Sequence, residues 1–477
     1  MDIKALSEIF ATPARIEALS ALFAERKTRR IRLNGLEGSA PALLFASLKK
    51  TKQPFLIIAD DFDTAGYVYH DICQIHGDER VKILPSGYKR DIKYGQVDAP
   101  SQILRTEVFN SWGNKQTGWV VTCPEALAEK VPCRERLDES TIEVSISDKT
   151  TMSALLQRLR DQGFCQTDYV YEPGQYAKRG SILDVYSYAN ELPFRIDFFD
   201  DEIDSIRSFN VETQLSEQRH DSISIISAMQ HEAKTDMVSF LDFIDEKTII
   251  ICQSVGWLMS RIKAITSSTI SSATIIANEG DRNAMDHVVD GEAFCERLMQ
   301  FKIVEYGAAV DGVTALQADA ELNFNCSPQA LYHKNFDLIS DSFSRHISDG
   351  YGLYILSDSP HQTDRLKHIF DDRGDDIAFT AVERTLHQGF VDHDIKACFF
   401  TDHQIFDRFH KYNLKSDRAR SGKLALSLKE LNQIEVGDYI VHIDHGVGVF
   451  SGLVRTDVNG NVQEMIKLTY LNDDIIF

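Results

Sequence analysis

The sequence lacks the features that would assign it to several common functional classes. Its eight cysteines are scattered and form no C-x-x-C pair, so neither a zinc ribbon nor a thioredoxin-like redox site is expected. No apolar run approaches the roughly 20 residues that a membrane-spanning helix needs. The N-terminal residues also lack the basic-then-apolar layout of a signal peptide. We therefore expect a reduced, cytoplasmic protein with no membrane partner.

The chain also lacks an excess of positive charge. It has 51 Lys and Arg against 72 Asp and Glu, a net charge of −21, and the acidic excess is spread along its length. Only residues 26–32 form a dense basic run, which is typical of a solvated helix end. Contacts to DNA phosphates need clustered Lys and Arg, so this composition disfavours general duplex binding and favours protein partners.

Recognisable catalytic and metal-binding patterns are missing as well. No Ser-His-Asp or Cys-His arrangement is supported by spacing, so we expect no catalytic residue. The acidic run 200–202 has no second ligand cluster, and His403 and His410 are not at H-E-x-x-H spacing. The group at 442–445, with two histidines and an aspartate, favours structural hydrogen bonds in a small barrel. We expect no metal site.

Residues 34–42, NGLEGSAPA, have the glycines of a phosphate-binding loop but lack the side chains that bind phosphate and Mg²⁺. Such a loop follows a strand and opens a helix with G-x-x-x-x-G-K-[ST]; here the loop contains Gly35, Gly38 and Ser39. Pro41 stands at the lysine position and Ala42 at the hydroxyl position, and proline has no backbone N–H to offer. The loop predicts a nucleotide-binding frame that no longer binds nucleotide. An ordinary glycine-rich strand-to-helix turn is the alternative, and the loop alone favours it.

The 477 residues predict several α/β domains. Apolar runs separated by helical patterns predict a parallel sheet, with strands at 30–33, 55–59, 81–84, 119–122 and again at 248–252. Alternating segments predict a small α+β insertion, with strands at Asp168–Tyr171, Ser181–Tyr186 and Phe194–Phe199. The expected order is a parallel-sheet domain, the insertion, the rest of the first domain, a further small α/β domain, a charged linker and a β domain: 1–142, 143–212, 213–330, 331–412, 413–431 and 432–477.

The last segment, 432–477, has an all-β pattern with Asn459-Gly460 as its hairpin turn. We expect an SH3- or Tudor-like small barrel whose strand edges are open to a partner strand. The chain stops after the apolar run Ile475–Phe477, so we expect this barrel to be truncated and the chain to be part of a longer protein.

Two segments, taken in order, resemble one known family. Residues 171–186, YEPGQYAKRGSILDVY, and 193–207, PFRIDFFDDEIDSIR, resemble domain 2 of the excision-repair protein UvrB. They are more similar to the equivalent module of the bacterial transcription-repair coupling factors. Residues 437–450, GDYIVHIDHGVGVF, resemble the RNA-polymerase-interaction domain of those factors, which is related to CarD-type regulators. A phosphate loop without its lysine precedes both segments, as in the coupling factors but not in UvrB.

The resemblance covers essentially the whole chain and implies a RecA-like first domain with a degenerate phosphate loop. It further implies a non-catalytic adaptor that recruits UvrA to lesions at stalled RNA polymerase. By the same resemblance Arg179, Arg195 and Phe199 contact UvrA. The resemblance places contacts to the RNA polymerase β subunit on one strand, at Phe450, Gly452, Leu453, Val454, Arg455 and Thr456. DNA, ATP and Mg²⁺ would be bound by motor domains absent from this chain, which itself takes no cofactor.

Alternatives remain open for the chain and for its site. The whole could be a UvrB-like nucleotide-binding repair subunit, against which Pro41 and Ala42 argue, or a CarD-like transcription regulator, against which residues 171–207 argue. Arg195 and Phe199 have an even spacing that puts them on one face of a strand. Arg195 could instead pair with Asp197 or Asp201, and Phe199 could belong to the core.

Overall fold

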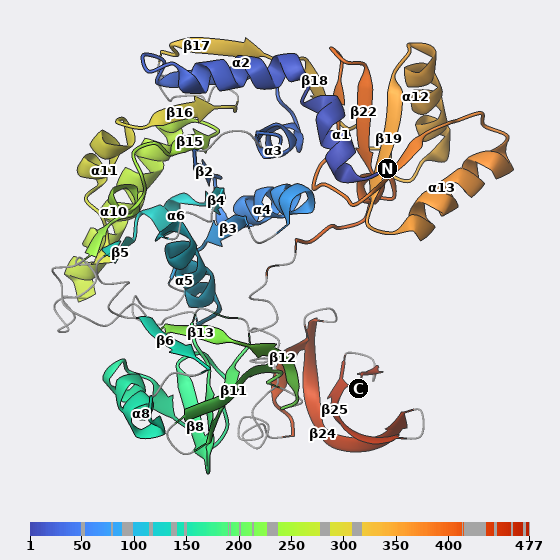
Figure 1. The fold of residues 1–477 in the computed structure, drawn as a ribbon. Helices are drawn as coiled ribbons and strands as arrows, with labels where there is room; N and C mark the ends of the chain where they lie inside the picture. The colour runs from blue at the N-terminus through green and yellow to red at the C-terminus, as the bar shows by residue number, and fades with distance from the viewer. Residues whose placement is uncertain are drawn as a thin grey trace. The chain divides into compact units, whose positions relative to one another are not determined.

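The protein is described by a computed structural model, which covers residues 1–48, 53–77, 80–87, 99–113, 118–134, 141–146, 150–188, 190, 192–199, 202–211, 214–226, 237–276, 287–307, 317–412, 414, 436–442, 446–458, 461–470 and 474–476. It consists of two compact units, Met1–Asp417 and Arg418–Phe477 (Figure 1). In the described residues no helix has both the length and the apolar character needed to span a membrane.

A seven-stranded parallel sheet organises the first unit, in the order β17-β1-β16-β15-β2-β4-β3. Strands β2, β3, β4 and β15 are buried at every residue, as expected for a parallel sheet covered on both faces. The strand bounds are β1 (Arg30–Asn34), β2 (Phe55–Ile58), β3 (Val81–Leu84), β4 (Trp119–Thr122), β15 (Ile249–Cys252), β16 (Lys302–Glu305) and β17 (Ala320–Asn323). The predicted parallel sheet is thus confirmed.

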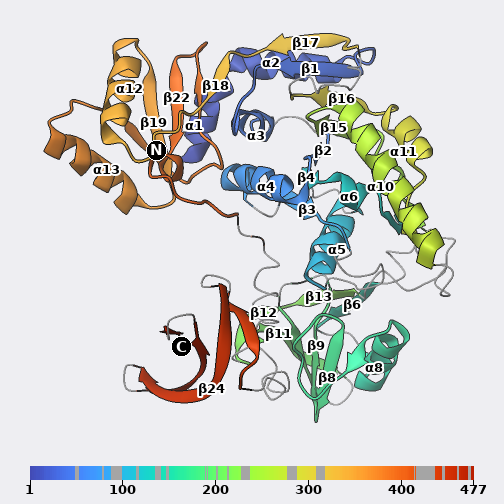
Figure 2. The same cartoon turned by 180° about the vertical axis from the view of Figure 1, so that it is seen from behind.

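Helices cover both faces of this sheet (Figures 1 and 2). One face packs against α2 (Pro13–Ala24), α3 (Ala40–Ala46) and α4 (Phe62–His76), and α1 (Ile3–Phe10) packs on α3 and α4. The other face packs against α5 (Ala99–Gly113), α6 (Pro124–Leu127), α9 (Phe240–Phe243), α10 (Val255–Ile276) and α11 (Gly291–Leu298). A short antiparallel pair, β5 (Lys130–Pro132) and β14 (Met237–Ser239), accompanies the second group.

The inserted unit is larger than the sequence predicted. Its six-stranded sheet has the order β12-β11-β10-β9-β8-β7, and β6 pairs with β13 beside it. Its elements are β6 (Thr141–Ser145), α8 (Met152–Asp161), β7 (Cys165–Gln166), β8 (Gln175–Arg179), β9 (Ile182–Val185), β10 (Phe194–Phe199), β11 (Glu202–Phe209), β12 (Ser216–His220) and β13 (Ser222–Ile226). The predicted end at residue 212 is therefore too early, because β12 is polar and exposed and has no alternation to reveal it. The strand predicted at 168–171 is wrong.

A third sheet, β18-β21-β22-β19-β20, forms what we call the 326–412 unit. Its elements are β18 (Cys326–Pro328), α12 (Phe336–Ser348), β19 (Gly352–Ser357), α13 (Pro360–Arg373), β20 (Thr380–Glu383), β21 (Phe390–Asp392), β22 (Ala397–Thr401) and α14 (Asp402–Ile405). The unit begins at β18, slightly before the predicted boundary at 331. The last helix of the unit ends at Ile405.

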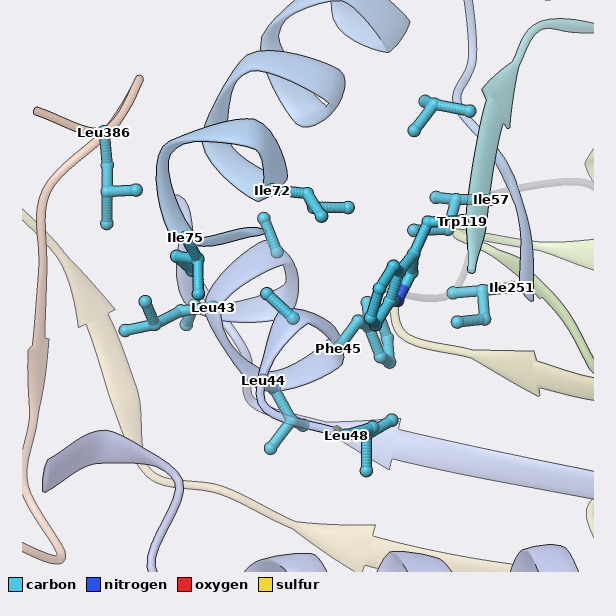
Figure 3. Close-up of a cluster of buried hydrophobic side chains, with 14 of the residues drawn as sticks. Leu43, Leu44, Phe45, Leu48, Ile57, Ile72, Ile75, Trp119, Ile251 and Leu386 are labelled. Carbon is cyan, nitrogen blue, oxygen red and sulfur yellow. The ribbon is translucent and has the colours of Figure 1, made fainter. Parts of the chain in front are cut away.

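The 326–412 unit shares a hydrophobic core with α1, α3 and α4. Phe10 contacts the rings of Phe390 and Phe399 at centroid distances of 5.2 and 5.9 Å. Leu386 joins the cluster formed by Leu43, Ile72 and their neighbours (Figure 3). The 326–412 unit is therefore joined to the helices of the first sheet by one continuous core. The predicted linker at 413–431 lies outside the described residues apart from Leu414.

The second unit is a four-stranded antiparallel sheet in the order β23-β24-β25-β26. Its strands are β23 (Tyr439–His442), β24 (Gly446–Val458), β25 (Asn461–Thr469) and β26 (Ile475–Ile476). The all-β prediction for this segment is confirmed, whereas its assignment as an SH3- or Tudor-like barrel stays a prediction. The expected turn at Asn459-Gly460 lies outside the described residues, between two strands that pair as a hairpin.

Candidate functional site

The inserted sheet has one face that packs on α8 and a second face that is only partly covered. On β10 the alternation places Phe194, Ile196 and Phe198 in the core with α8. Arg195 and Phe199 occupy the other face, as their even spacing predicted. A small cluster of Val170, Ala177, Tyr186 and Phe209 covers part of this second face.

Two predicted site residues, Arg179 and Arg195, share one buried carboxylate. Arg195 donates from Nε to Asp184 Oδ1 at 2.8 Å and from Nη2 to Asp184 Oδ2 at 2.9 Å. Arg179 Nη2 donates to the same Oδ2. Strand register explains the arrangement, because Asp184 lies directly opposite Arg195 on adjacent antiparallel strands. Asp184 is fully buried, so the two guanidinium groups neutralise a charge that would otherwise be costly to bury.

Aromatic rings support the same two arginines. The guanidinium of Arg179 lies 4.8 Å from the Tyr169 ring centroid, and that of Arg195 lies 4.4 Å from the Phe209 centroid. The hydrogen bond to Asp184 raises the pKa of Arg195 from its usual value, against the opposing effect of burial. The Arg195 side chain retains 15% of its exposure and that of Arg179 retains 38%. Arg179 is therefore the more accessible of the two cations.

Phe199 is on the surface, not in the core. It is 77% exposed at the end of β10, and Tyr171 and Tyr169 of the same domain are 54% and 47% exposed. The alternative partners expected for Arg195 are not the ones found. Asp197 lies 3.7 Å from Arg207, and Asp201 is outside the described residues. The sequence could not single out Asp184 because its pairing depends on the β9–β10 register.

Sequence reasoning missed two more arginines in line with Arg195. Arg195 is opposite Arg207 on β11, and Arg207 is opposite Arg219 on β12. The three residues thus form a row across neighbouring strands on the less covered face. Like charges placed directly opposite each other destabilise a sheet, so an acidic surface would gain by binding this row. The spacing of twelve residues between successive arginines gave no signal without the register.

The loop between β1 and α3 has the predicted strand–loop–helix setting, with both glycines at positive φ. Gly35 has φ +76° and Gly38 has φ +55°. A Cβ at Gly35 would lie 2.0 Å from the carbonyl oxygen of Phe324, and one at Gly38 would lie 2.8 Å from that of Gly389. Pro41 and Ala42 are buried at the start of α3. The close approaches therefore come from the protein's own backbone.

Polar groups of this loop are hydrogen-bonded to other residues of the same chain. Ser39 N donates to the carbonyl of Gln388 at 3.2 Å, and Gln388 N donates to Ser39 Oγ at 2.9 Å. Ser39 Oγ in turn donates to Asp71 Oδ2 at 2.5 Å, while His387 N donates to Asp71 Oδ1 at 2.7 Å. A segment of the 326–412 unit thus makes the kind of contact that a phosphate would make in a working loop.

In the second unit, the residues predicted to contact RNA polymerase lie on β24. β23 pairs with β24 as far as Val449, and Gly437 and Asp438 extend the pairing to Phe450, whereas β25 pairs along the length of β24 to Val458. The register of β24 with β25 shifts between Phe450 and Leu453, and Gly452 there has φ +101°. Among the described strands, residues 453–458 therefore have a partner on one edge only. Phe450 is 4% exposed and belongs to the interior of the sheet.

Metal-ligating side chains do not gather in the part of the chain that the structure describes. No group of three or more His, Cys, Asp or Glu residues there is placed to hold a metal ion. None of the described cysteines forms a disulfide, and burial raises the pKa of the Cys326 and Cys398 thiols to about 12. Thiols with such pKa values are poor nucleophiles near neutral pH.

Comparison with known proteins identifies two domains in the chain. Residues 142–231 match the UvrB interaction domain, and residues 434–477 match the CarD-like/TRCF RID domain. The first match agrees with the inserted sheet and extends past residue 212, as the structure does. The second match covers all four strands of the second unit.

Curated relatives match almost the whole chain. A transcription-repair-coupling factor of Staphylococcus haemolyticus (strain JCSC1435) is 22% identical over 99% of this chain and 46% of its own length. One from Bacillus subtilis (strain 168) is 21% identical over 93% of this chain and 44% of its own length. The chain therefore spans about half the length of the curated relatives it matches. Together with the two domain matches, these relatives support the resemblance of the chain to the N-terminal part of a transcription-repair-coupling factor.

Proposed function

We propose that this chain is the non-catalytic adaptor part of a transcription-coupled DNA repair factor. It recruits UvrA through the inserted sheet and docks on RNA polymerase through the second unit. The observation that carries the proposal is the surface made by Arg179, Arg195 and Phe199. These three residues lie on the less covered face of the domain that matches the UvrB interaction domain.

The chemistry of this surface suits an acidic protein partner. Arginine offers a planar fork to carboxylates, and an arginine beside an exposed aromatic ring is a common hot-spot pair. Asp184 and the rings of Tyr169 and Phe209 hold the two guanidinium groups in place, so less rotamer entropy is lost on binding. The row Arg195–Arg207–Arg219 extends the positive surface across three strands.

Docking on the RNA polymerase β subunit is assigned to the strand Phe450–Thr456. The edge of β24 beyond Phe450, which has no partner among the described strands, supports strand addition, in which backbone hydrogen bonds supply affinity. In strand addition the side chains along the paired strands supply specificity.

We assign the β1–α3 loop as a degenerate phosphate loop in a RecA-like domain that binds neither ATP nor Mg²⁺. Pro41 and Ala42 replace the chemical groups, and the Gln388 segment fills the loop. ATP-driven translocation on DNA then belongs to motor and regulatory domains of the full-length protein. The alternatives of a nucleotide-dependent UvrB-like subunit or a CarD-like regulator have less support, because the loop is filled and because residues 142–231 match a UvrB interaction domain.

Binding of purified UvrA to the full chain tests the proposal, with Phe199→Ala as the first variant. Phe199 is largely exposed, so its removal should weaken binding by at least about tenfold and leave the melting temperature unchanged. Arg158→Ala is the matched control, since Arg158 is exposed on α8, which packs on the opposite face of the sheet. Undiminished UvrA binding by a folded Phe199→Ala protein, or no binding by the unaltered chain, would contradict the assignment.

A further inference from the structure

Four histidines meet where the 326–412 unit joins α4. His70 belongs to α4, whereas His387, His403 and His410 come from the 326–412 unit. The rings of His403 and His410 are stacked at 4.6 Å between centroids. His70 and His387 lie 5.1 and 6.5 Å from the His410 ring. Four imidazoles with no assigned task are thus concentrated at one joint between two sheets.

The cluster is built to hold neutral imidazoles. The Nδ1 atoms of all four rings are buried and have no hydrogen-bond partner among the described residues. His403 donates from Nε2 to the carbonyl of His387 at 2.9 Å, and the His387 ring stacks on Tyr67 at 3.5 Å. The nearest carboxylate oxygens are Asp71 Oδ1, 3.6 Å from His70 Nδ1, and Asp402 Oδ1, 3.8 Å from His403 Nδ1, both beyond hydrogen-bond distance. A proton added to His387 or His410 would create a second N–H donor that has no hydrogen-bond acceptor among the described residues.

The charged groups facing the cluster are already engaged. From α4, Asp71 accepts hydrogen bonds from Ser39 and His387. From the 326–412 unit, Asp402 accepts from Arg408 at 2.6 Å and from Ser357 at 2.8 Å, and Asp358 accepts from Thr385 N at 3.1 Å. One turn before Tyr67 on α4, Asp63 accepts from the hydroxyl of Tyr412, whose ring lies against Tyr67. These acids partly offset a positive charge, but none has a carboxylate oxygen directed at His410.

We propose that this histidine cluster makes the joint between α4 and the 326–412 unit a proton-operated latch. The latch is closed while the imidazoles are neutral, and it opens when they take up protons and repel one another. Opening withdraws residues 387–388 from Asp71 and Ser39, and so uncovers the β1–α3 loop. The latch works without a bound partner and gives a regulatory task to a loop that has lost its phosphate chemistry.

The pH range follows from the sign of the shifts. Burial lowers the pKa of His387, His403 and His410 below their usual value, and the pKa of His410 falls from 6.5 to about 4. At pH values between about 4 and 6.5, His410 binds a proton when the joint is open but not when it is closed. The closed state therefore loses stability as the pH falls below about 6.5, by up to about tenfold in its equilibrium constant per pH unit for each such histidine.

Hydrogen–deuterium exchange of the full chain, with a metal chelator present, tests the latch directly. The amides of His387 and Gln388 donate across the joint, so their protection reports its closure. After correction for intrinsic exchange rates, we expect their protection to fall at least about tenfold between pH 7 and pH 5.5. Amides of β19 and β22, inside the same unit, should keep theirs. Unchanged protection at residues 387–388, or an equal loss throughout β19 and β22, would overturn the proposal.

A pair of variants identifies the groups responsible. The double variant His403→Gln, His410→Gln removes two titrating rings. At pH 5.5 the amides of residues 387–388 should therefore be at least about tenfold better protected in this variant than in the unaltered chain. His361→Gln with His368→Gln is the control, because both residues are exposed on α13 away from the cluster. If the control changes the pH dependence as much as the cluster variant, the proposal is wrong. Should the cluster variant not fold, the measurements on the unaltered chain still decide the question.

Discussion

Asp184 and Arg195 form a two-point ion pair between β9 and β10, with N–O distances of 2.8 and 2.9 Å. The carboxylate is buried and the guanidinium is partly exposed, so one residue anchors the other at the surface. Arg195 therefore has a structural task as well as its proposed task in binding. The two tasks can be separated by comparing variants that affect them differently.

Asp184→Asn should destabilise the inserted domain and weaken UvrA binding together. The amide keeps the shape of the side chain but loses the charge that holds Arg179 and Arg195. We expect a loss of about 1.5–3 kcal/mol in the free energy of unfolding, the range for hydrogen bonds to charged groups. Chemical denaturation and UvrA binding should be measured on the same protein. A variant with unchanged stability would show that the ion pair contributes nothing net.

Arg179→Ala and Arg195→Ala should differ in their effect on stability. Both should weaken UvrA binding by more than about tenfold, because removing one member of a buried interfacial pair typically costs about 2–5 kcal/mol. Arg179 is the more exposed, so its loss should lower stability by less than about 1 kcal/mol, whereas Arg195→Ala should cost more. Arg→Lys should rescue poorly at either position, since an ammonium cannot reproduce the planar fork. Undiminished UvrA affinity in a folded double variant would remove both residues from the interface.

Much of the fold follows from local patterns in the sequence. The mainly apolar runs Val81–Leu84 and Trp119–Thr122 are strands with the predicted bounds, because strands of a parallel sheet buried on both faces are short and mostly apolar. The polar strand Ser216–His220 was missed for the opposite reason, since its order comes from pairing with β11 and not from burial.

The sequence predicted which side chains form the sites, but it did not predict the residues that they contact. The even spacing of Arg195 and Phe199 correctly gave a shared face, but the partner Asp184 depends on register. Pro41 and Ala42 indicated a loop without phosphate chemistry. That Gln388 would fill it could not be inferred, because the contact joins residues 349 positions apart in the chain. The histidine cluster is similarly non-local, with His70 far from His387 in sequence.

The chain should show no saturable binding of Mg-ATP in calorimetry. The loop has no lysine or hydroxyl at the two essential positions, and the backbone N–H of Gln388 is hydrogen-bonded to the Ser39 hydroxyl. Ser39→Ala is expected to leave this result unchanged while lowering stability by about 1–2 kcal/mol, because it removes hydrogen bonds to Asp71 and Gln388. Saturable binding that is lost on changing Gly38 to proline would show instead that the loop still takes nucleotide.

Proline substitutions on β24 can test whether RNA polymerase adds a strand to its open edge. In an antiparallel strand, the N–H groups of consecutive residues point to opposite edges, so Arg455 and Thr456 face different neighbours. One of the two therefore donates towards β25, with which both residues are in register, and the other donates towards the edge without a described partner. Proline removes the donor in either case.

Of the pair Arg455→Pro and Thr456→Pro, one should reduce the strand content of the second unit and the other should leave most of it in place. Both should lower retention of RNA polymerase by more than about tenfold, since the backbone donors supply the affinity in strand addition. Circular dichroism and polymerase pull-down on the same proteins distinguish the two effects, with Arg455→Ala and Thr456→Ala as controls that keep the N–H. If the variant that preserves the sheet binds polymerase as well as its alanine control does, docking does not use this edge.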